Sequence, residues 1–104
     1  MSDTVFRVNT DETLVDMRLS KEEVKRSLEE VERIANLPYP FADATVAPIQ
    51  LTHGEWYRQK LSEESWRTII AISVTEKEII VHAILLRDEN TYALVRQLYE
   101  TMTP

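Results

Sequence analysis

The sequence contains no cysteine among its 104 residues. Disulfide bonds, thiolate metal sites and a thiol nucleophile are therefore excluded. Only one glycine and four prolines are present, which argues against a sandwich or barrel with many tight turns. We therefore expect a domain held together by a hydrophobic core, and the lack of cysteine suits a cytoplasmic location.

Long apolar runs are also missing. The runs at residues 79–81 and 83–86 are separated by His82, and no run approaches the roughly 20 residues that span a bilayer. The first four residues, Met-Ser-Asp-Thr, show no basic stretch leading into an apolar run, which is the pattern of a secretory signal. We expect a single domain over residues 1–104, cytoplasmic and without a membrane partner.

Basic side chains are outnumbered, with 12 Lys and Arg against 18 Asp and Glu, so the formal net charge is −6. Nucleic-acid-binding proteins usually carry a positive field, because neutralising phosphates supplies much of their affinity. Overall composition therefore argues against an RNA-binding protein. Most of the acidic excess falls in residues 1–52, which leaves a local basic patch open for the C-terminal half.

The strongest helical pattern covers residues 21–36. Apolar side chains recur there at helical spacing, at Val24, Leu28, Val31, Ile34 and Ala35. Ser20 is followed three residues later by Glu23, which predicts a capping box at the start of the helix. Pro38 predicts its end, because the residue before a proline is pushed out of the helical region.

Strand patterns lie on both sides of this helix. Residues 5–8 predict a short strand, and residues 56–61, 66–73 and 79–86 predict a meander joined by polar turns. Residues 11–17 predict a helical turn, residues 37–48 a connection that packs on the domain, and a last helix begins after Asn90 or Thr91. The predicted fold is α+β: a small antiparallel sheet of the N-terminal strand plus the C-terminal three-stranded meander, with helices packed on one side.

Three pieces of sequence, in this order after the helix, resemble one known family. Residues 53–61 (HGEWYRQKL) hold a glycine followed by an aromatic-basic-x-basic strand. Residues 65–70 (SWRTII) place an aromatic–arginine pair before apolar residues, and Arg87 and Tyr92 follow the last strand. Over about residues 4–99 the chain resembles the RelE/ParE superfamily of toxins from toxin–antitoxin modules.

A RelE-type resemblance implies metal-independent endonucleolytic cleavage of mRNA, commonly in the ribosomal A site, and a cognate antitoxin as partner. It implies no cofactor and no metal ion. Carried over by position, the basic residues of the first motif are Arg58 and Lys60, the arginine of the second is Arg67, and the last motif supplies Arg87 and Tyr92. The acidic net charge departs from the family, whose ribosome-dependent members are typically basic.

These residue types suit the implied reaction. Attack of a ribose 2′-hydroxyl on the adjacent phosphate develops charge that guanidinium groups stabilise as rigid hydrogen-bond donors. A lysine crowded by arginines can have its pKa lowered enough to act as a base, and a tyrosine can stack on a nucleotide base. Arg58 and Lys60 are two residues apart, so a strand would place both on one face.

Each candidate also has a purely structural interpretation. Arg58 and Lys60 could form a solvent-facing row on an edge strand, and Arg67 could pair with Glu63, Glu64 or Glu78. Tyr92 could be an aromatic at the edge of the core, and His82, inside an apolar strand, is interpreted as a core histidine. Neither histidine belongs to a pattern with metal-ligand spacing.

Two other functions remain open from the sequence. A ParE-like toxin would inhibit DNA gyrase through protein contacts without cutting RNA. A non-catalytic interaction protein could also retain the fold. ParE-like members generally lack the full set of basic residues and tyrosine, so the presence of this set favours the endoribonuclease.

Overall fold

The computed structural model describes residues 5–50, 55–61 and 63–102. The described residues form six strands, two α-helices and one short 3-10 helix, Pro40–Ala42. In chain order they are β1 (Arg7–Asn9), β2 (Leu14–Val15), α1 (Lys21–Ala35), β3 (Val46–Pro48), β4 (Trp56–Gln59), β5 (Trp66–Ser73), β6 (Glu78–Leu86) and α2 (Thr91–Met102).

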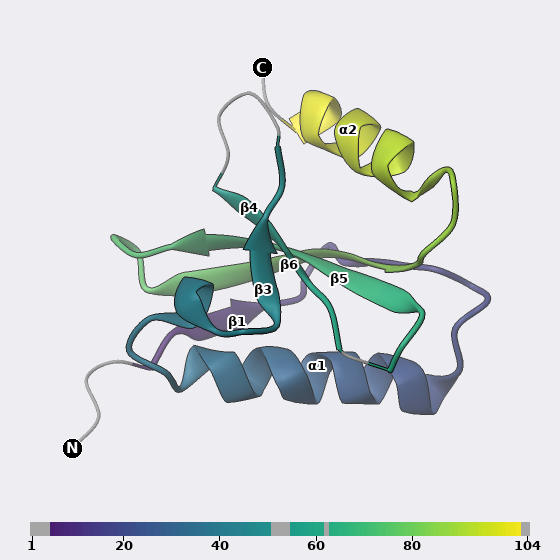
Figure 1. Ribbon diagram of the computed structural model, residues 1–104. Helices are drawn as coiled ribbons and strands as arrows, with labels where there is room; N and C mark the ends of the chain where they lie inside the picture. Colours follow the sequence, from purple (N-terminus) through teal and green to yellow (C-terminus); the bar gives the residue numbers. More distant parts are fainter. Residues whose placement is uncertain (1–4, 51–54, 62, 103–104) are drawn as a thin grey trace.

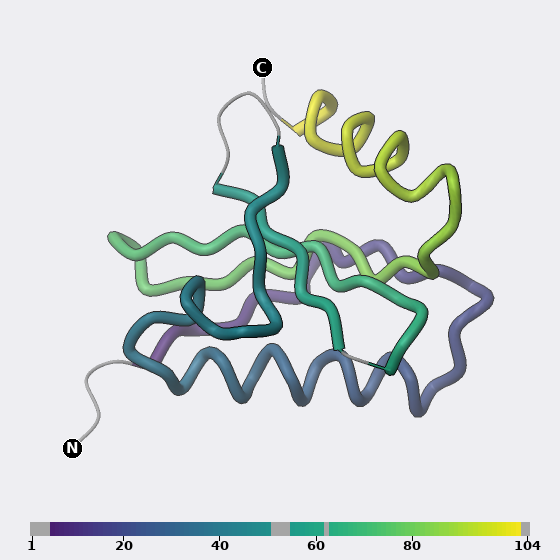
Figure 2. Tube along the Cα trace, viewed as in Figure 1, coloured from purple at the N-terminus to yellow at the C-terminus, as the bar shows by residue number. Residues whose placement is uncertain are grey.

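The strands form one mixed sheet in the order β1-β6-β5-β4-β3, with β2 also paired to β6. β3, β4, β5 and β6 are joined by antiparallel pairs, as the predicted meander requires, whereas β1 and β2 run parallel to β6. The segment between β1 and α1 passes one end of the sheet. The chain leaves β6 towards α2 at this same end (Figure 2). The predicted α+β class is confirmed, with the N-terminal strand joining the sheet in parallel.

The helices do not share one side of the sheet as expected; α1 and α2 cover opposite faces (Figure 1). The reason lies in β5 and β6, which carry apolar residues on both faces. Ile70, Ile72 and Ile79 pack with α1, while Ile69 and Ala83 pack with α2. A single helical layer would leave one of these apolar faces in water.

Helix α1 follows the prediction closely. Ser20 accepts a hydrogen bond from the backbone N–H of Glu23, and the Glu23 carboxylate accepts one from the backbone N–H of Ser20, so the capping box is present. Val31 and Ile34 are fully buried against the sheet, and Val24 and Leu28 are half-buried at its edge. The predicted apolar stripe is therefore the face that packs on the sheet.

Two short segments differ from the prediction. Residues 11–17 do not form a helical turn, because Leu14 and Val15 pair with β6 as β2. The connection at residues 37–48 contains β3, which pairs with β4. Both strands have only two or three residues, and the partners of β2 on β6 lie far away in the sequence, whereas β3 pairs with the next strand, β4.

A bulge in β6 places His82 in the core beneath α2. Ile69 pairs with Ala83 and Ile70 with Val81, so His82 has no partner in the ladder. Its ring stacks on Trp56 at a centroid distance of 4.0 Å, and the side chain is 7% exposed. Burial lowers the pKa of His82 from 6.5 to about 4, so the ring is neutral at physiological pH.

We predict that His82 makes the protein lose stability in mild acid. In the unfolded chain the imidazole takes up a proton near pH 6.5, but in the folded protein only near pH 4. The unfolded state therefore binds more protons between these values, and stability should fall by at most about 3 kcal/mol as the pH drops from 6.5 to 4. Urea unfolding of the wild type and of His82→Phe, which keeps a ring against Trp56, measures this loss.

The difference in unfolding free energy between His82→Phe and the wild type should be constant from pH 7 to 9. Below pH 6.5 the wild type should lose stability that the variant keeps. Parallel curves down to pH 4 would contradict the assignment. The paired carboxylate of Asp43, whose pKa is lowered to about 2 by the Arg33 guanidinium, contributes its own loss only at lower pH.

Candidate functional site

Two of the sequence-predicted arginines lie on the α2 face of the sheet. Arg58 is opposite Ile69 in the β4–β5 ladder, and Arg67 is opposite Leu85 in the β5–β6 ladder. Ile69 and Leu85 both belong to the core under α2, so the two arginines project towards that side. They stand on neighbouring strands, in diagonal positions of the same face.

Arg67 is the most enclosed member of the set, at 6% exposure. Its Nη1 atom donates hydrogen bonds to the backbone carbonyls of Trp66 (3.0 Å) and Glu64 (3.4 Å). Burial lowers the pKa of Arg67, the charges of Arg87 and Arg58 lower it further, and Tyr92 raises it. These influences show that all three side chains lie near the Arg67 guanidinium.

Tyr92 and Arg87 reach this place from the end of β6 and the start of α2. Arg87 directly follows β6 and is exposed, and its backbone N–H donates to the carbonyl of Ser65. Tyr92 is the second residue of α2 and is 43% exposed. Together with Arg58, Tyr92 lines a hollow of about 320 Å³ beside the end of β3.

Lys60 does not join the other four residues. β4 ends at Gln59, and the backbone N–H of Lys60 donates to the carbonyl of Thr45. Lys60 lines a separate hollow together with Arg26 and Glu30 of α1. The cluster therefore consists of Arg58, Arg67, Arg87 and Tyr92, which we call the arginine cluster.

The arginine cluster lacks carboxylate partners in the part of the chain that the structure describes. Elsewhere, Arg18, Arg26 and Arg33 each form an ion pair with an Asp or Glu. No such pair involves Arg58, Arg67 or Arg87 within residues 5–50, 55–61 and 63–102. In a protein with a net charge of −6, this is an uncompensated concentration of positive charge.

The alternative interpretation of Arg67, an ion pair with Glu63, Glu64 or Glu78, is not supported by the described residues. The Glu64 carboxylate instead contacts Arg26 of α1 at 3.4 Å, and only the Glu64 carbonyl accepts from Arg67. Glu78 accepts a hydrogen bond from the Asn9 side-chain amide. An unpaired, partly desolvated guanidinium group is a good partner for a phosphate.

The loop that carries Arg87 is held by contacts that sequence reasoning missed. The Asp16 carboxylate accepts hydrogen bonds from the backbone N–H of Leu86 (3.1 Å) and from Arg18. Arg18 in turn binds the Asp88 carboxylate at 3.0 Å. Thr91 closes the loop, accepting from the backbone N–H of Asp88 and donating to the carbonyl of Leu86. No local pattern predicts the contacts of Asp16 and Arg18 with this loop, because 70 residues separate Asp16 from Leu86 and Arg18 from Asp88.

Other kinds of site find little support in the described residues. No group of three His, Asp or Glu side chains among them is arranged to hold a metal ion. None of the helices described is long and apolar enough to cross a membrane. The arginine cluster is therefore the best-defined candidate site in this part of the chain.

Comparison with known proteins gives a match at the level of the fold. No family model matches the sequence, and no curated protein matches it with significance. Among solved structures, the chain is similar to one described as the archaeal RelE-RelB complex from Pyrococcus horikoshii OT3, with a TM-score of 0.55 and 20% identity. The match covers 82% of this chain and 98% of the other. It shows that this protein has a RelE-like fold.

We predict that Asp16 holds the loop after β6 more firmly than Arg18 does. Asp16→Ala leaves the partly buried N–H of Leu86 without its acceptor, which should cost about 1–3 kcal/mol in unfolding free energy. Arg18→Ala removes only exposed ion pairs and should change stability little. Urea denaturation of both variants measures the difference, and equal losses would show that the ion pairs dominate. Asp16→Asn, which keeps an acceptor oxygen, serves as the control.

Proposed function

We propose that this protein is the toxin of a toxin–antitoxin module and that it cleaves mRNA on translating ribosomes as a RelE-like endoribonuclease. The observation that supports this most is the arginine cluster, in which three guanidinium groups and a tyrosine meet without carboxylate partners in the described chain. The RelE-like fold and the motif resemblance add independent support.

In this proposal the cluster binds and activates one phosphate of the RNA. The exposed Arg87 and Tyr92 and the half-buried Arg58 are the groups that a nucleotide can reach first. Arginine donors would hold the scissile phosphate, and the Tyr92 ring would stack on an adjacent base, which fixes the 2′-hydroxyl in line for attack. Positioning and charge stabilisation then supply the catalysis, with no metal ion required.

Arg67 has a particular role in the proposal because of its anchoring. Its guanidinium is enclosed and fixed to the carbonyls of Trp66 and Glu64, so its charge does not have to reorient during the reaction. A preorganised positive charge stabilises the pentacoordinate phosphorane more than the starting phosphate, since negative charge accumulates only in the transition state. Neighbouring Arg58 and Arg87 make this place more attractive to an anion.

The acidic surface is consistent with a substrate that is delivered by the ribosome. A net charge of −6 opposes long-range attraction to free RNA, and the local cluster acts only over about one Debye length, 8 Å at physiological salt. We therefore expect weak, salt-sensitive binding of free RNA. An antitoxin is the expected partner, and the structural neighbour is described as a RelE-RelB complex.

We predict that Arg67→Gln lowers the rate of mRNA cleavage by a factor of about 10²–10³. The glutamine amide can still donate to the two backbone carbonyls, so the fold should persist while the charge is lost. Cleavage is measured by primer extension on mRNA in a translating extract, and folding by circular dichroism. Tyr92→Phe should retain more activity than Tyr92→Ala, because it keeps a ring for stacking.

Lys60→Gln is the matched control, since Lys60 belongs to the motif but lies outside the arginine cluster. It should retain most of the wild-type rate. If Lys60→Gln were as inactive as Arg67→Gln, the cluster as defined here would be incomplete. If the wild type left mRNA intact but inhibited DNA gyrase, a ParE-like function would replace the proposed one.

A further inference from the structure

The connection between β6 and α2 is held on both sides of Arg87 by the segment that follows β2. The backbone N–H of Leu86, the residue before Arg87, donates to the Asp16 carboxylate at 3.1 Å. The carboxylate of Asp88, the residue after Arg87, accepts a hydrogen bond from the Arg18 guanidinium at 3.0 Å. The backbone on either side of Arg87 is therefore tied to residues that lie far away in the sequence.

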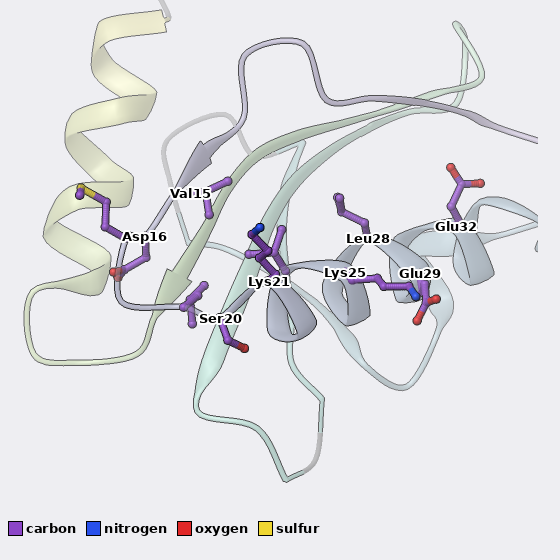
Figure 3. Close-up of a pocket in the computed structure, with 11 residues that line it drawn as sticks. Val15, Asp16, Ser20, Lys21, Lys25, Leu28, Glu29 and Glu32 are labelled. Carbon is purple, nitrogen blue, oxygen red and sulfur yellow. The ribbon is translucent and has the colours of Figure 1, made fainter.

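One guanidinium group, that of Arg18, connects these two carboxylates. Its Nε and Nη2 atoms donate to Asp16 at 3.0 and 2.8 Å, and Nη2 also donates to Asp88. These hydrogen bonds lower the pKa of Asp16 well below its usual value, so its carboxylate stays ionised at physiological pH. In Figure 3, Asp16 lies beside the end of β6, next to Val15. We call the contacts of Arg18 with Asp16 and Asp88 the Arg18 bridge.

Asp88 continues the Arg18 bridge into the first turn of α2. Its Oδ1 atom accepts from the backbone N–H of Asn90 at 2.8 Å, while Oδ2 accepts from Arg18. The backbone N–H of Asp88 donates to the Thr91 hydroxyl, and its carbonyl accepts from the Thr91 N–H. Tyr92 is the next residue, so the bridge reaches both members of the arginine cluster that come from this part of the chain.

We propose that Arg18 is a positioning residue of the arginine cluster, which fixes Arg87 where it can receive a phosphate. Arg87 has an exposed side chain with no carboxylate partner in residues 5–50, 55–61 and 63–102, so its place depends on the backbone around it. The Arg18 bridge restrains this backbone before a phosphate binds, which lowers the entropic cost of binding. This role rests on the proposed function in one respect, because an RNA phosphate is taken as the ligand.

The Arg18 bridge also has an electrostatic effect on Arg87. Asp88 is adjacent to Arg87 in the chain, and its carboxylate would compete with a phosphate for the Arg87 guanidinium. Arg18 already binds this carboxylate at 3.0 Å. The charge of Arg87 therefore remains available to an anionic ligand.

An ion pair with a purely structural role would behave differently. The Arg18 side chain is 57% exposed, and exposed ion pairs contribute little to the free energy of unfolding. Such contacts can nevertheless hold a loop locally, since loops open without unfolding of the whole domain. Loss of Arg18 should therefore affect ligand binding at Arg87 much more than it affects global stability.

The test is an NMR titration of the whole protein with inorganic phosphate, which follows the Nε–Hε resonance of Arg87. In Arg18→Ala the dissociation constant should rise at least about fivefold, because a preorganised donor is lost. Single-turnover cleavage of mRNA should slow by about tenfold, which is less than the roughly 10²-fold that a displacement of about 1 Å can cost. The midpoint of urea unfolding should remain close to that of the wild type.

Two further variants make the result specific. Arg18→Lys keeps the positive charge but lacks the planar fork, so its phosphate affinity should lie between those of the wild type and Arg18→Ala. Arg33→Ala is the matched control, because Arg33 also binds two carboxylates, those of Glu30 and Asp43, but lies in the last turn of α1, at the end of the helix away from the bridge. Its loss should change phosphate affinity and cleavage by less than about twofold, because distant charges are largely screened.

Equal phosphate affinities of Arg18→Ala and Arg33→Ala would overturn the positioning role. It would also be overturned if phosphate did not shift the Arg87 signal of the wild type. A loss of unfolding free energy in Arg18→Ala as large as that in Asp16→Ala would overturn it in favour of a structural ion pair.

The phosphate titration does not depend on RNA cleavage. If the wild type leaves mRNA intact but Arg18→Ala weakens phosphate binding as described, the positioning role stands and the proposed function fails. If the wild type cuts mRNA and Arg18→Ala behaves like Arg33→Ala, only the positioning role fails.

Discussion

The structure depends on the β5–β6 hairpin, because both of its faces must be covered. The eight residues of β5 and nine of β6 form the longest ladder of the sheet, and most of their side chains are buried. The bulge at His82 brings Ala83 and Leu85 to the same face as Ile69. One face requires α1 and the other requires α2, and the connections to both helices follow from this requirement.

The arginine cluster lies where the apolar cover beneath α2 ends. Val95 and Tyr99 cover the middle of that face, where Tyr99 packs edge-on against Trp56 at 5.2 Å. Arg58 lies opposite Ile69 and Arg67 lies opposite Leu85, so the two arginines take the next positions on this face. The same loop that turns the chain from β6 into α2 brings Arg87 and Tyr92 to this place. The element that completes the core therefore also completes the candidate site.

The distribution of charge separates structural arginines from the others. Arg33 binds Glu30 and Asp43, and Arg18 binds Asp16 and Asp88, so these side chains tie one segment to another. The cluster arginines contact backbone carbonyls or solvent instead. In an acidic protein, leaving three neighbouring cations without carboxylates costs stability through mutual repulsion. That cost is understandable if an anionic ligand occupies the site during function.

The sequence predicted those parts of the fold whose signals are local and long. Helix α1 was recognisable from its capping box and apolar stripe, and β5 and β6 from extended apolar runs. β2 and β3 were missed because two or three residues carry no periodicity, and β2 in addition exists only through pairing with the distant strand β6. The side on which α2 packs could not be inferred either, since its single apolar stripe fits either face of the sheet.

For the candidate site, the motif resemblance named five residues. The structure brings four of them together and leaves Lys60 apart. Strand alternation predicted Lys60 on the same face as Arg58. This prediction fails because β4 ends at Gln59, one residue before Lys60. The contacts of Asp16 and Arg18 with the loop after β6 depend on tertiary structure alone. Sequence indicated the residue types of the site, and the fold decided which of them meet.

The central claim is that the arginine cluster receives an RNA phosphate. The most direct test is an NMR titration that follows the Nε–Hε resonances of Arg58, Arg67 and Arg87 and the Tyr92 ring. The ligand is a short RNA whose 2′-hydroxyls are methylated, so that it cannot be cut, added at low salt. The account predicts that these four signals shift together and saturably, and that added salt weakens the binding. If they stay unchanged while signals elsewhere shift, or if nothing shifts at millimolar RNA, the claim is wrong.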